Sequence, residues 1–386
     1  MSVTAAQGFV ASGLHAGIKR RKFDMAMIAT DDGQPVPCAA VFTQNKFVAP
    51  PVELDRATLK ANGGKAAAVV INSGNANAGT GLPGYKDAQL MAAATGEALQ
   101  VANSHVLVCS TGIIGTPLPM EPILSHVPKL AKKLSVEGAN DAARGILTTD
   151  HETKEVVIKG SNFTLGGMAK GCGMIAPNMA TMLAFLTTDA NVPQSVMQKA
   201  LKAASDASFN TLNVDGAMST NDTAMLFASG RRGKADHDEF ANAVLAACRD
   251  LTLKMARDAE GMTRMAHLTV SGAANEQQAR VAAKAVVENN LVKCSWYGGD
   301  PYWGRLLAAA GSTGVDFDVD KSWVSYGGIT VAKGGVGCEH DGDALVEHML
   351  GDEVEIEVHL GAGKGSATMI GIDLGPGYIK ENSKTS

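Results

Sequence analysis

The residues of this chain best suited to chemistry lie in one tract, KGCGMIAPNMATMLAF, at positions 170–185. Its centre is the pair Ala180-Thr181, a small residue followed by a hydroxyl residue, and Pro177 just before it favours a turn. A tight turn can strain the peptide bond of this pair and bring the Thr181 hydroxyl onto the preceding carbonyl. Cleavage would leave Thr181 as a new N-terminus, whose free α-amine can act as base to its own hydroxyl. The tract therefore predicts a self-cleaving chain with a threonine nucleophile.

The same tract also has an ordinary structural interpretation. A glycine-rich turn that leads into an apolar strand is common in α/β proteins, and Ala-Thr pairs are frequent. The local pattern by itself leaves both interpretations open.

Several segments spread along the chain share a resemblance to one enzyme family. KGCGMIAPNMATMLAFLTTDA, from Lys170, resembles the signature of the ornithine acetyltransferases, which are glutamate N-acetyltransferases of arginine biosynthesis. Other segments agree with this family in order and approximate spacing: INSGNANAGTG from Ile71, STGIIGTPLPM from Ser110, AARGILTTD from Ala142, SFNTLNVDGAMSTND from Ser208, RDAEGMTR from Arg257, NNLVKCSWYGGDPYWGR from Asn289 and GIDLGPGYIKENSKTS at the end. The resemblance covers nearly the whole chain.

The resemblance implies autoproteolysis between Ala180 and Thr181, which gives an α chain of residues 1–180 and a β chain of residues 181–386. It implies an acyltransferase that moves the acetyl group from N2-acetyl-L-ornithine to L-glutamate by a ping-pong mechanism, through an acetyl-Thr181 intermediate. Two α and two β chains are expected to form a heterotetramer. No cofactor is expected, and acetyl-CoA stays open as a second acetyl donor, which would add N-acetylglutamate synthase activity.

The resemblance also implies roles for individual residues. Thr111 and Gly112 correspond to the oxyanion hole of the family, and acyl transfer needs such donors because it passes through a tetrahedral oxyanion. Substrate contacts are expected from Thr148, Lys170, Thr181, Glu260, Asn382 and Ser386. The chain ends about one residue short of the usual family tail, so either Ser386 or Thr385 would take the place of the terminal hydroxyl residue. Without the family, residues such as Lys170 and Glu260 are more often solvated surface residues.

Two other classes of function stay open. An N-terminal-nucleophile amidohydrolase or aminopeptidase of the same fold would share the self-cleavage and let water take the acyl group. A non-catalytic homologue would bind amino acids without turnover. Ala217 and Met218, which stand where the family has polar residues, motivate this last alternative.

Composition limits the remaining possibilities. A net charge of −5 gives no reason to expect a nucleic-acid partner, and no apolar run approaches the roughly 20 residues that span a membrane. The six cysteines are widely spaced, which predicts buried free thiols in a reducing cytoplasm and no metal site. The basic segment 19–22 faintly resembles part of a transit peptide, but we expect a cytoplasmic protein without a targeting signal.

Hydrophobic patterns predict a mixed α/β protein. The chain length of 386 residues predicts two packed units, because it exceeds what one hydrophobic core usually serves. Residues 67–71 and 105–109 are predicted strands that lead into glycine-rich loops, and 353–358 alternate as a strand with one wet face. Residues 237–258 and 275–287 are predicted helices. The family resemblance implies a layered αββα-type sheet core built from both cleavage products, with a smaller C-terminal unit at about 275–350.

Overall fold

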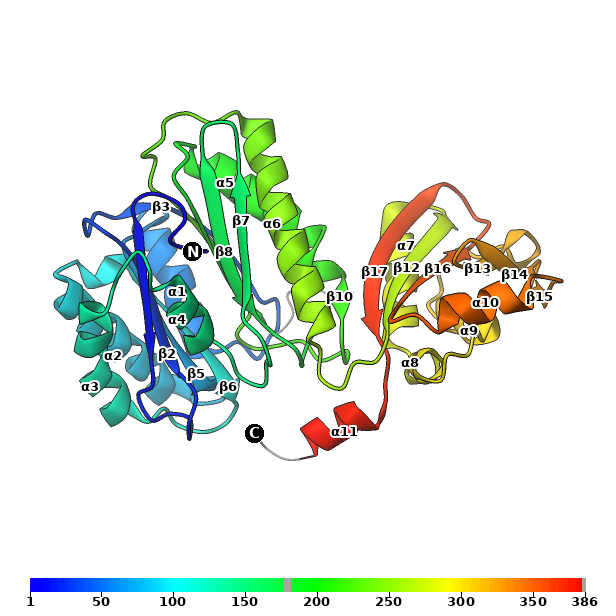
Figure 1. Ribbon diagram of the computed structural model, residues 1–386, viewed down its shortest axis with the longest axis horizontal. Coiled ribbons are helices and arrows are strands. Elements are labelled where there is room, and N and C mark those ends of the chain that lie inside the picture. Colours follow the sequence, from blue (N-terminus) through cyan, green and yellow to red (C-terminus); the bar gives the residue numbers. More distant parts are fainter. Residues whose placement is uncertain (177–181, 384–386) are drawn as a thin grey trace. The chain divides into compact units, whose positions relative to one another are not determined.

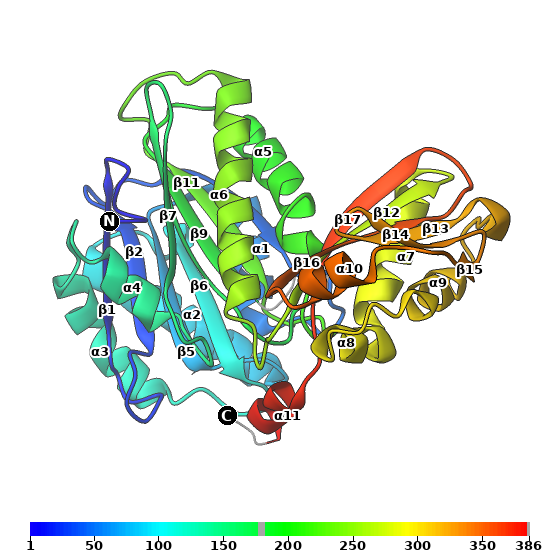
Figure 2. The same cartoon turned by 45° about the vertical axis from the view of Figure 1, so that its right-hand side comes forward.

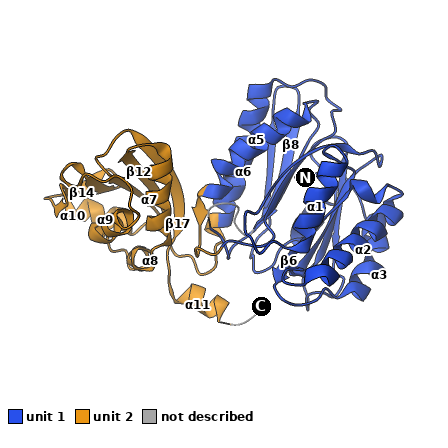
Figure 3. Cartoon of the chain, turned by 180° about the vertical axis from the view of Figure 1, so that it is seen from behind, with its two compact units in different colours: residues 1–210, 218–255, 385–386 blue, residues 211–217, 256–384 orange. Residues whose placement is uncertain are grey.

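The computed structural model describes residues 1–176 and 182–383, which form two compact units (Figure 3). The first unit comprises Met1–Asn210 and Met218–Met255, and the second comprises Thr211–Ala217 and Ala256–Lys384. The expected C-terminal unit of residues 275–350 lies inside the second unit, which extends farther in both directions.

Two β-sheets packed face to face form the centre of the first unit. The four-stranded sheet has the order β1 (Phe9–Leu14), β2 (Met25–Thr30), β5 (Ala68–Asn75) and β6 (Val106–Ile113). The six-stranded sheet has the order β4 (Lys65–Ala66), β3 (Val36–Phe42), β11 (Thr223–Ala228), β9 (Leu183–Thr188), β8 (Thr164–Lys170) and β7 (Lys154–Lys159). Apolar side chains of both sheets share one buried cluster, which includes Ile28, Ile71, Leu107, Met168, Phe185 and Met225.

Helices cover the outer face of each sheet (Figure 1). The four-stranded sheet is covered by α1 (Pro50–Ala61), α2 (Gly81–Leu99) and α3 (Met120–Lys132), and α4 (Ala139–Gly145) packs on β1 and β2. The six-stranded sheet is covered by α5 (Gln194–Asp206), which packs on β3 and β11, and by α6 (His237–Arg257), whose Leu251 lies against Gly167 of β8. Figure 2 shows α5 and α6 across the two sheets from α2 and α3. The expected αββα layers are therefore confirmed.

Segments from both sides of the predicted cleavage point share the six-stranded sheet. Strand β9 begins two residues after Thr181 and lies between β8 and β11. It runs antiparallel to β8, with Lys170 opposite Leu183, and parallel to β11, with Leu183 opposite Thr223. Lys170, Leu183 and Thr223 therefore occupy one row across three neighbouring strands.

A seven-stranded sheet forms the centre of the second unit. Its order is β10 (Leu212–Asn213), β17 (Gly365–Ile372), β12 (Met265–Ala273), β16 (Glu353–His359), β13 (Trp323–Tyr326), β14 (Ile329–Lys333) and β15 (Val336–Gly337). The helices of this unit are α7 (Glu276–Glu288), α8 (Asn290–Tyr297), α9 (Trp303–Gly311), α10 (Gly342–Met349) and α11 (Pro376–Asn382), and short 3₁₀ helices in the chain span Asn103–His105, Phe209–Thr211 and Val319–Lys321.

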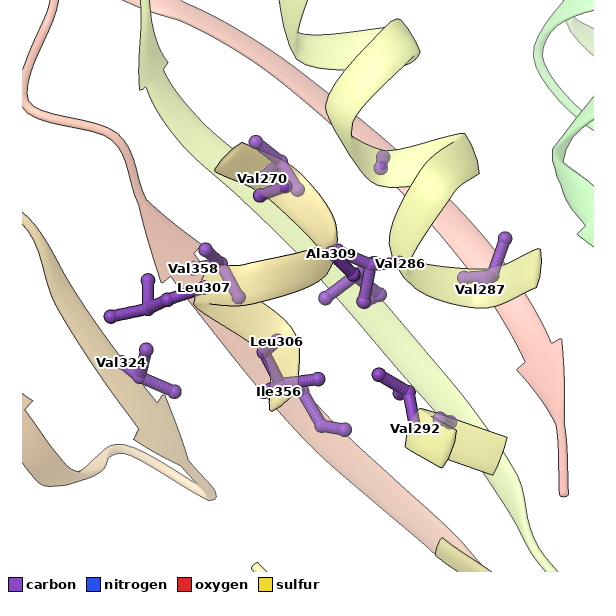
Figure 4. Close-up of a cluster of buried hydrophobic side chains, with 14 of the residues drawn as sticks. Val270, Val286, Val287, Val292, Leu306, Leu307, Ala309, Val324, Ile356 and Val358 are labelled. Atoms are coloured by element: carbon purple, nitrogen blue, oxygen red, sulfur yellow. The ribbon is translucent and has the colours of Figure 1, made fainter. Parts of the chain in front are cut away.

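The core of the second unit joins one face of this sheet to the helices. Figure 4 shows Val270 and Ile356 of the sheet among Val286 and Leu306 of the helices. In β16 the valines and Ile356 are buried while Glu353 and Glu355 are exposed, which confirms the strand predicted from the alternating sequence.

The cysteine prediction is only partly confirmed. All six cysteines are free, and Cys38, Cys109, Cys172 and Cys248 are buried. Cys294 is exposed and Cys338 is half-buried, so the expectation of buried thiols is wrong for these two. The reason for Cys294 is that the short helix α8 turns its neighbours Lys293 and Ser295 inward. Among the helices of the described residues, none is both long enough and apolar enough to cross a membrane.

The core between the two sheets of the first unit can be tested at Phe185, in the middle of β9, which has no exposed surface. Phe185→Ala should lower the free energy of unfolding by about 3–5 kcal/mol, because it opens a cavity where β8 and β11 cannot close in. Denaturant titration measures this loss. The control Phe47→Ala, at a side chain that is 58% exposed, should change stability by only about 0.5 kcal/mol. Equal effects of the two variants would contradict this packing.

Candidate functional site

The predicted oxyanion residues lie at the end of β6, beside the end of β5. Strands β5 and β6 are parallel, and Gly74 pairs with Gly112. Gly112 has a φ of +135°, and a Cβ there would come within 2.3 Å of the carbonyl carbon of Gly74. Only glycine fits this close approach. Thr111 is buried while Gly112 is exposed, so the backbone of the pair passes from the sheet to the surface at this point.

A buried polar network holds this strand end in place. The Ser110 hydroxyl donates to Asn72 Oδ1 at 2.6 Å. Asn221 Nδ2 donates to the Ser110 carbonyl at 2.9 Å and to the Ala76 carbonyl at 2.6 Å. Since Asn221 lies just before β11, its amide group ties the ends of β5 and β6 to the six-stranded sheet.

The next residue, Asp222, contacts the backbone that follows the predicted nucleophile. Its Oδ1 accepts a hydrogen bond at 2.9 Å from the backbone N–H of Met182, the residue after Thr181. Asp222 has no exposed surface, and this burial raises the pKa of its carboxyl group well above the ordinary value. The hydrogen bond from Met182 and the positive charge of Lys170 act in the opposite direction and lower this pKa in part.

Lys170, at the end of β8, belongs to a buried charge cluster with Asp150 and Lys154. Lys170 Nζ donates to Thr148 Oγ1 at 2.7 Å and lies 3.8 Å from Asp150 Oδ2. Lys154 Nζ donates to Asp150 Oδ1 at 2.8 Å. Each of the three charged residues is only 1% exposed. A lysine buried in this way needs a carboxylate nearby, because an isolated charge is very costly to remove from water.

Hydrogen bonds and positive charges hold Asp150 in its ionised form. Burial alone would raise the pKa of its carboxyl group, but Lys170 and Lys154 more than offset this, and the pKa lies well below its ordinary value. The backbone N–H groups of Thr148 and Gly171 also donate to the carboxylate, at 3.0 and 2.7 Å. One carboxylate therefore fixes both lysines and the Thr148 backbone.

In the second unit, the structure brings Glu260 and Asn382 together. Asn382 Nδ2 donates to Glu260 Oε2 at 2.8 Å and to the Tyr378 carbonyl at 3.1 Å. Gly261, with a φ of +67°, allows α11 to approach, because a Cβ there would come within 2.0 Å of the Tyr378 backbone nitrogen. Glu260 is 6% exposed, so its interpretation as a solvated surface residue is wrong.

Comparison with known proteins gives this site its context. The model of the ArgJ family matches residues 10–386. This chain belongs to the ArgJ family. A relative from Caldanaerobacter subterraneus subsp. tengcongensis, named "Arginine biosynthesis bifunctional protein ArgJ", is 44% identical over 97% of this chain and 96% of its own length. A relative of the same name from Streptomyces avermitilis is 43% identical over the full length of both chains.

Two solved structures from ArgJ-type proteins are also similar in sequence. The arginine biosynthesis bifunctional protein ArgJ of Bacillus halodurans is 34% identical, covers 51% of this chain and 96% of its own, and has a TM-score of 0.48. The ornithine acetyltransferase of Mycobacterium tuberculosis, complexed with ornithine, is 38% identical, covers 46% of this chain and 94% of its own, and has a TM-score of 0.44.

The site residues expected from the sequence are distributed over both units of this ArgJ-family chain. In the first unit Lys170 and Thr148 are in contact, and the interpretation of Lys170 as a solvated surface lysine is wrong. In the second unit Glu260 and Asn382 are in contact. Ala180, Thr181 and Ser386 lie outside the described residues. The catalytic and substrate-binding roles of all these residues stay predictions.

Sequence reasoning did not single out Asp150, Asn221 and Asp222, which contact the candidate residues or their neighbours in the chain. Two of the family segments contain them, since AARGILTTD ends in Asp150 and SFNTLNVDGAMSTND ends in Asn221-Asp222. The only signal in the sequence was that a polar or acidic residue directly follows two hydroxyl residues in each segment. This pattern does not show which groups from other parts of the chain the residue will contact.

Removal of the Asp150 carboxylate should measurably lower the stability of the folded protein. Asp150→Asn leaves the ammonium groups of Lys154 and Lys170 buried without their carboxylate, so the free energy of unfolding should fall by about 3–5 kcal/mol near neutral pH. The control Asp206→Asn removes the carboxylate of an exposed ion pair, in which the Lys202 side chain is 68% exposed and the Asp206 side chain is 42% exposed. This change should cost at most about 1 kcal/mol.

The same variant predicts a pH dependence. The folded-state pKa of Asp150 lies below its unfolded-state value, so its contribution to stability is complete above about pH 4 and is lost as the pH falls through the folded-state pKa. The difference in stability between wild type and Asp150→Asn should therefore shrink below about pH 4. Urea unfolding between about pH 3 and about pH 7 measures it, and a difference that stays constant over this range would contradict the charge cluster.

Proposed function

We propose that this chain is a self-processed glutamate N-acetyltransferase of arginine biosynthesis, which transfers the acetyl group of N2-acetyl-L-ornithine to L-glutamate. The observation that carries this proposal is the buried Lys170–Thr148 pair, whose lysine shares a sheet row with Leu183, two residues after Thr181. The Lys170 ammonium is a cationic, hydrogen-bonding group suited to an amino-acid carboxylate, and it lies in the sheet row that the chain enters after the predicted nucleophile. Membership in the ArgJ family supports the same function.

The first step of the proposal is self-cleavage at Ala180–Thr181. The Thr181 hydroxyl oxygen attacks the Ala180 carbonyl carbon, and the peptide C–N bond breaks as the acyl group moves from nitrogen to oxygen. Water then hydrolyses the resulting ester. The products are the Ala180 carboxylate and a Thr181 residue with a free α-amine and a free hydroxyl, which makes it both nucleophile and base.

The second step is acetyl transfer in two halves. The α-amine of Thr181 takes the hydroxyl proton while the oxygen attacks the acetyl carbonyl of acetylornithine. The amide C–N bond breaks, ornithine leaves with the proton on its nitrogen, and Thr181 holds an acetyl ester. The α-amine of glutamate then attacks the ester carbonyl carbon, and the bond between this carbon and the Thr181 oxygen breaks. The proton lost by the glutamate nitrogen passes through the Thr181 α-amine to the freed hydroxyl as acetylglutamate leaves. Thr111 and the N–H of Gly112 stabilise the oxyanion of each tetrahedral intermediate.

One carboxylate site can serve both halves of this reaction. Acetylornithine and glutamate each carry an α-carboxylate, and the Lys170 ammonium offers it a point charge. Asp222 contacts the N–H of Met182 and so positions the chain directly after Thr181. The proposed chemistry uses groups of the chain itself, water and the substrates, and needs no cofactor. Use of acetyl-CoA as a second donor and assembly into two α and two β chains are further parts of the proposal.

Self-cleavage can be tested by the intact mass of the denatured protein. Wild type should give two species that match residues 1–180 and 181–386, and Thr181→Ala should give one full-length species without activity, because the attacking oxygen is gone. Thr181→Ser should still cleave, since the chemistry needs only a hydroxyl. A wild-type chain that transfers acetyl groups while remaining uncut would contradict the self-processing step.

Acetyl transfer can be tested with acetylornithine and glutamate in the absence of acetyl-CoA. Acetylglutamate should form, with parallel lines in double-reciprocal plots, as ping-pong kinetics require. Thr111→Ala should lower kcat about 100-fold, corresponding to about 3 kcal/mol for one oxyanion donor. The control Thr116→Ala, at an exposed residue of the following loop, should have no such effect. Acetate release without an acceptor, as fast as transfer, would indicate a hydrolase instead.

A further inference from the structure

Lys19 differs from the rest of the basic segment 19–22. Arg20, Arg21 and Lys22 are exposed, whereas Lys19 is half-buried and its Nζ donates to the Leu147 carbonyl at 2.8 Å. Lys19 thus extends from the N-terminal part of the chain to the segment that carries Thr148. The sequence grouped these four residues as one charged run, but the fold separates one of them.

A buried carboxylate fixes the backbone of Lys19. Asp24 has no exposed surface, and its oxygens accept hydrogen bonds from the backbone N–H groups of Ala16, Gly17 and Lys19 at 2.6, 3.1 and 2.9 Å. The loop therefore wraps around this side chain. As a result, the starting point of the Lys19 side chain is set by the fold.

The stem of Lys19 lies against the strand pair that carries the predicted oxyanion residues. A Cβ on Gly74 would come within 2.7 Å of Lys19 Cγ, so the stem occupies the space that the glycine leaves open. Gly74 in turn pairs with Gly112. The side chain thus lies beside the β5–β6 end before its ammonium group meets Leu147.

Two ammonium groups contact neighbouring residues of the same short segment. Lys19 Nζ contacts the Leu147 carbonyl, and Lys170 Nζ contacts the Thr148 hydroxyl. Leu147 and Thr148 are consecutive residues, whose Cα atoms are only about 3.8 Å apart, so the two lysines contact adjacent positions of the chain. A carboxylate has two oxygens and is well matched to two separate cationic donors.

The electrostatics of Lys19 favour an added anion. Burial lowers the pKa of its ammonium group to about 8, and although Asp24 and Asp150 raise it, the nearby Lys22 and Lys170 lower it further. Asp150 is already shared between Lys154 and Lys170, and Asp24 is occupied by backbone N–H groups. A carboxylate between the two lysines would offset both the burial and the repulsion.

We propose that Lys19 is a second cationic contact for the α-carboxylate of the substrates, acting together with Lys170, and that it sets the preference for amino acids over the corresponding amines. This inference rests on the proposed function and adds a specificity-determining residue to it. Since both substrates carry the α-carboxylate, Lys19 serves both halves of the transfer.

The test compares Lys19→Met, which keeps an apolar stem but removes the charge, with the control Lys22→Met at the exposed end of the segment. Calorimetry measures binding of ornithine and of putrescine, which is ornithine without its carboxylate. Lys19→Met should weaken ornithine binding about tenfold or more, as expected for a lost charged contact, and change putrescine binding less than about twofold. Lys22→Met should leave both unchanged, and Lys19→Arg should recover part of the ornithine affinity.

Kinetics provide a second readout. In Lys19→Met the KM values for acetylornithine and glutamate should rise together, with a smaller change in kcat. Equal losses for ornithine and putrescine would indicate a structural role and overturn the inference, as would a rise in KM for glutamate alone, which would assign Lys19 to the side-chain carboxylate. If Lys19→Met fails to fold by thermal melting, Lys19→Gln takes its place.

Failure of the inference is distinguishable from failure of the proposed function. A wild-type protein that transfers acetyl groups, with a Lys19→Met variant that still discriminates ornithine from putrescine as well as wild type, overturns the role of Lys19 alone. A folded wild-type protein that neither transfers acetyl groups nor binds ornithine overturns the proposed function and this inference with it.

Discussion

The position of β9 between β8 and β11 is the constraint on which the rest of the first unit depends. Its backbone is hydrogen-bonded on both sides, and Phe185 at its centre is buried between the two sheets. A strand held in this way fixes the point at which the chain enters the sheet, at Met182 and Leu183. Because β8 ends and β11 begins at the same edge, their terminal residues are brought to the entry of β9.

Polar groups at this edge are held by a small number of buried contacts. Asn221 joins the end of the four-stranded sheet to the loop before β11, and Asp222 holds the N–H of Met182. The Asp150 carboxylate contacts the ammonium groups of two lysines, Lys154 of β7 and Lys170 of β8. Asn221 and Asp222 connect segments that are 111 and 40 positions apart in the sequence, whereas the partners of Asp150 are closer along the chain. The loss of any one would leave a partner buried without its hydrogen bond, which is why such groups are costly to replace.

Charge is distributed unevenly around this edge. Lys154 and Lys170 share the Asp150 carboxylate, and Lys19 comes from a loop organised by a different carboxylate, Asp24. Lysine ammonium groups in partial burial are stabilised by anions and destabilised by one another. The fold thereby creates a local positive environment within a chain whose net charge is −5, so net charge gives no information about this site.

Local order in the sequence was enough to predict the class of fold, the long helix α6 and the family, because periodicity and family segments are local properties. The strands predicted at 67–71 and 105–109 are present, but they continue to Asn75 and Ile113 through residues that the sequence assigned to loops. Lys170 and Thr148 were also expected at the site, by resemblance. Only the tertiary structure decided that Lys170 is buried, that Asp150 is its carboxylate, and that Lys19 leaves its exposed neighbours to reach Leu147. Burial and pairing of charges depend on contacts between residues up to 128 positions apart, and no local pattern encodes them.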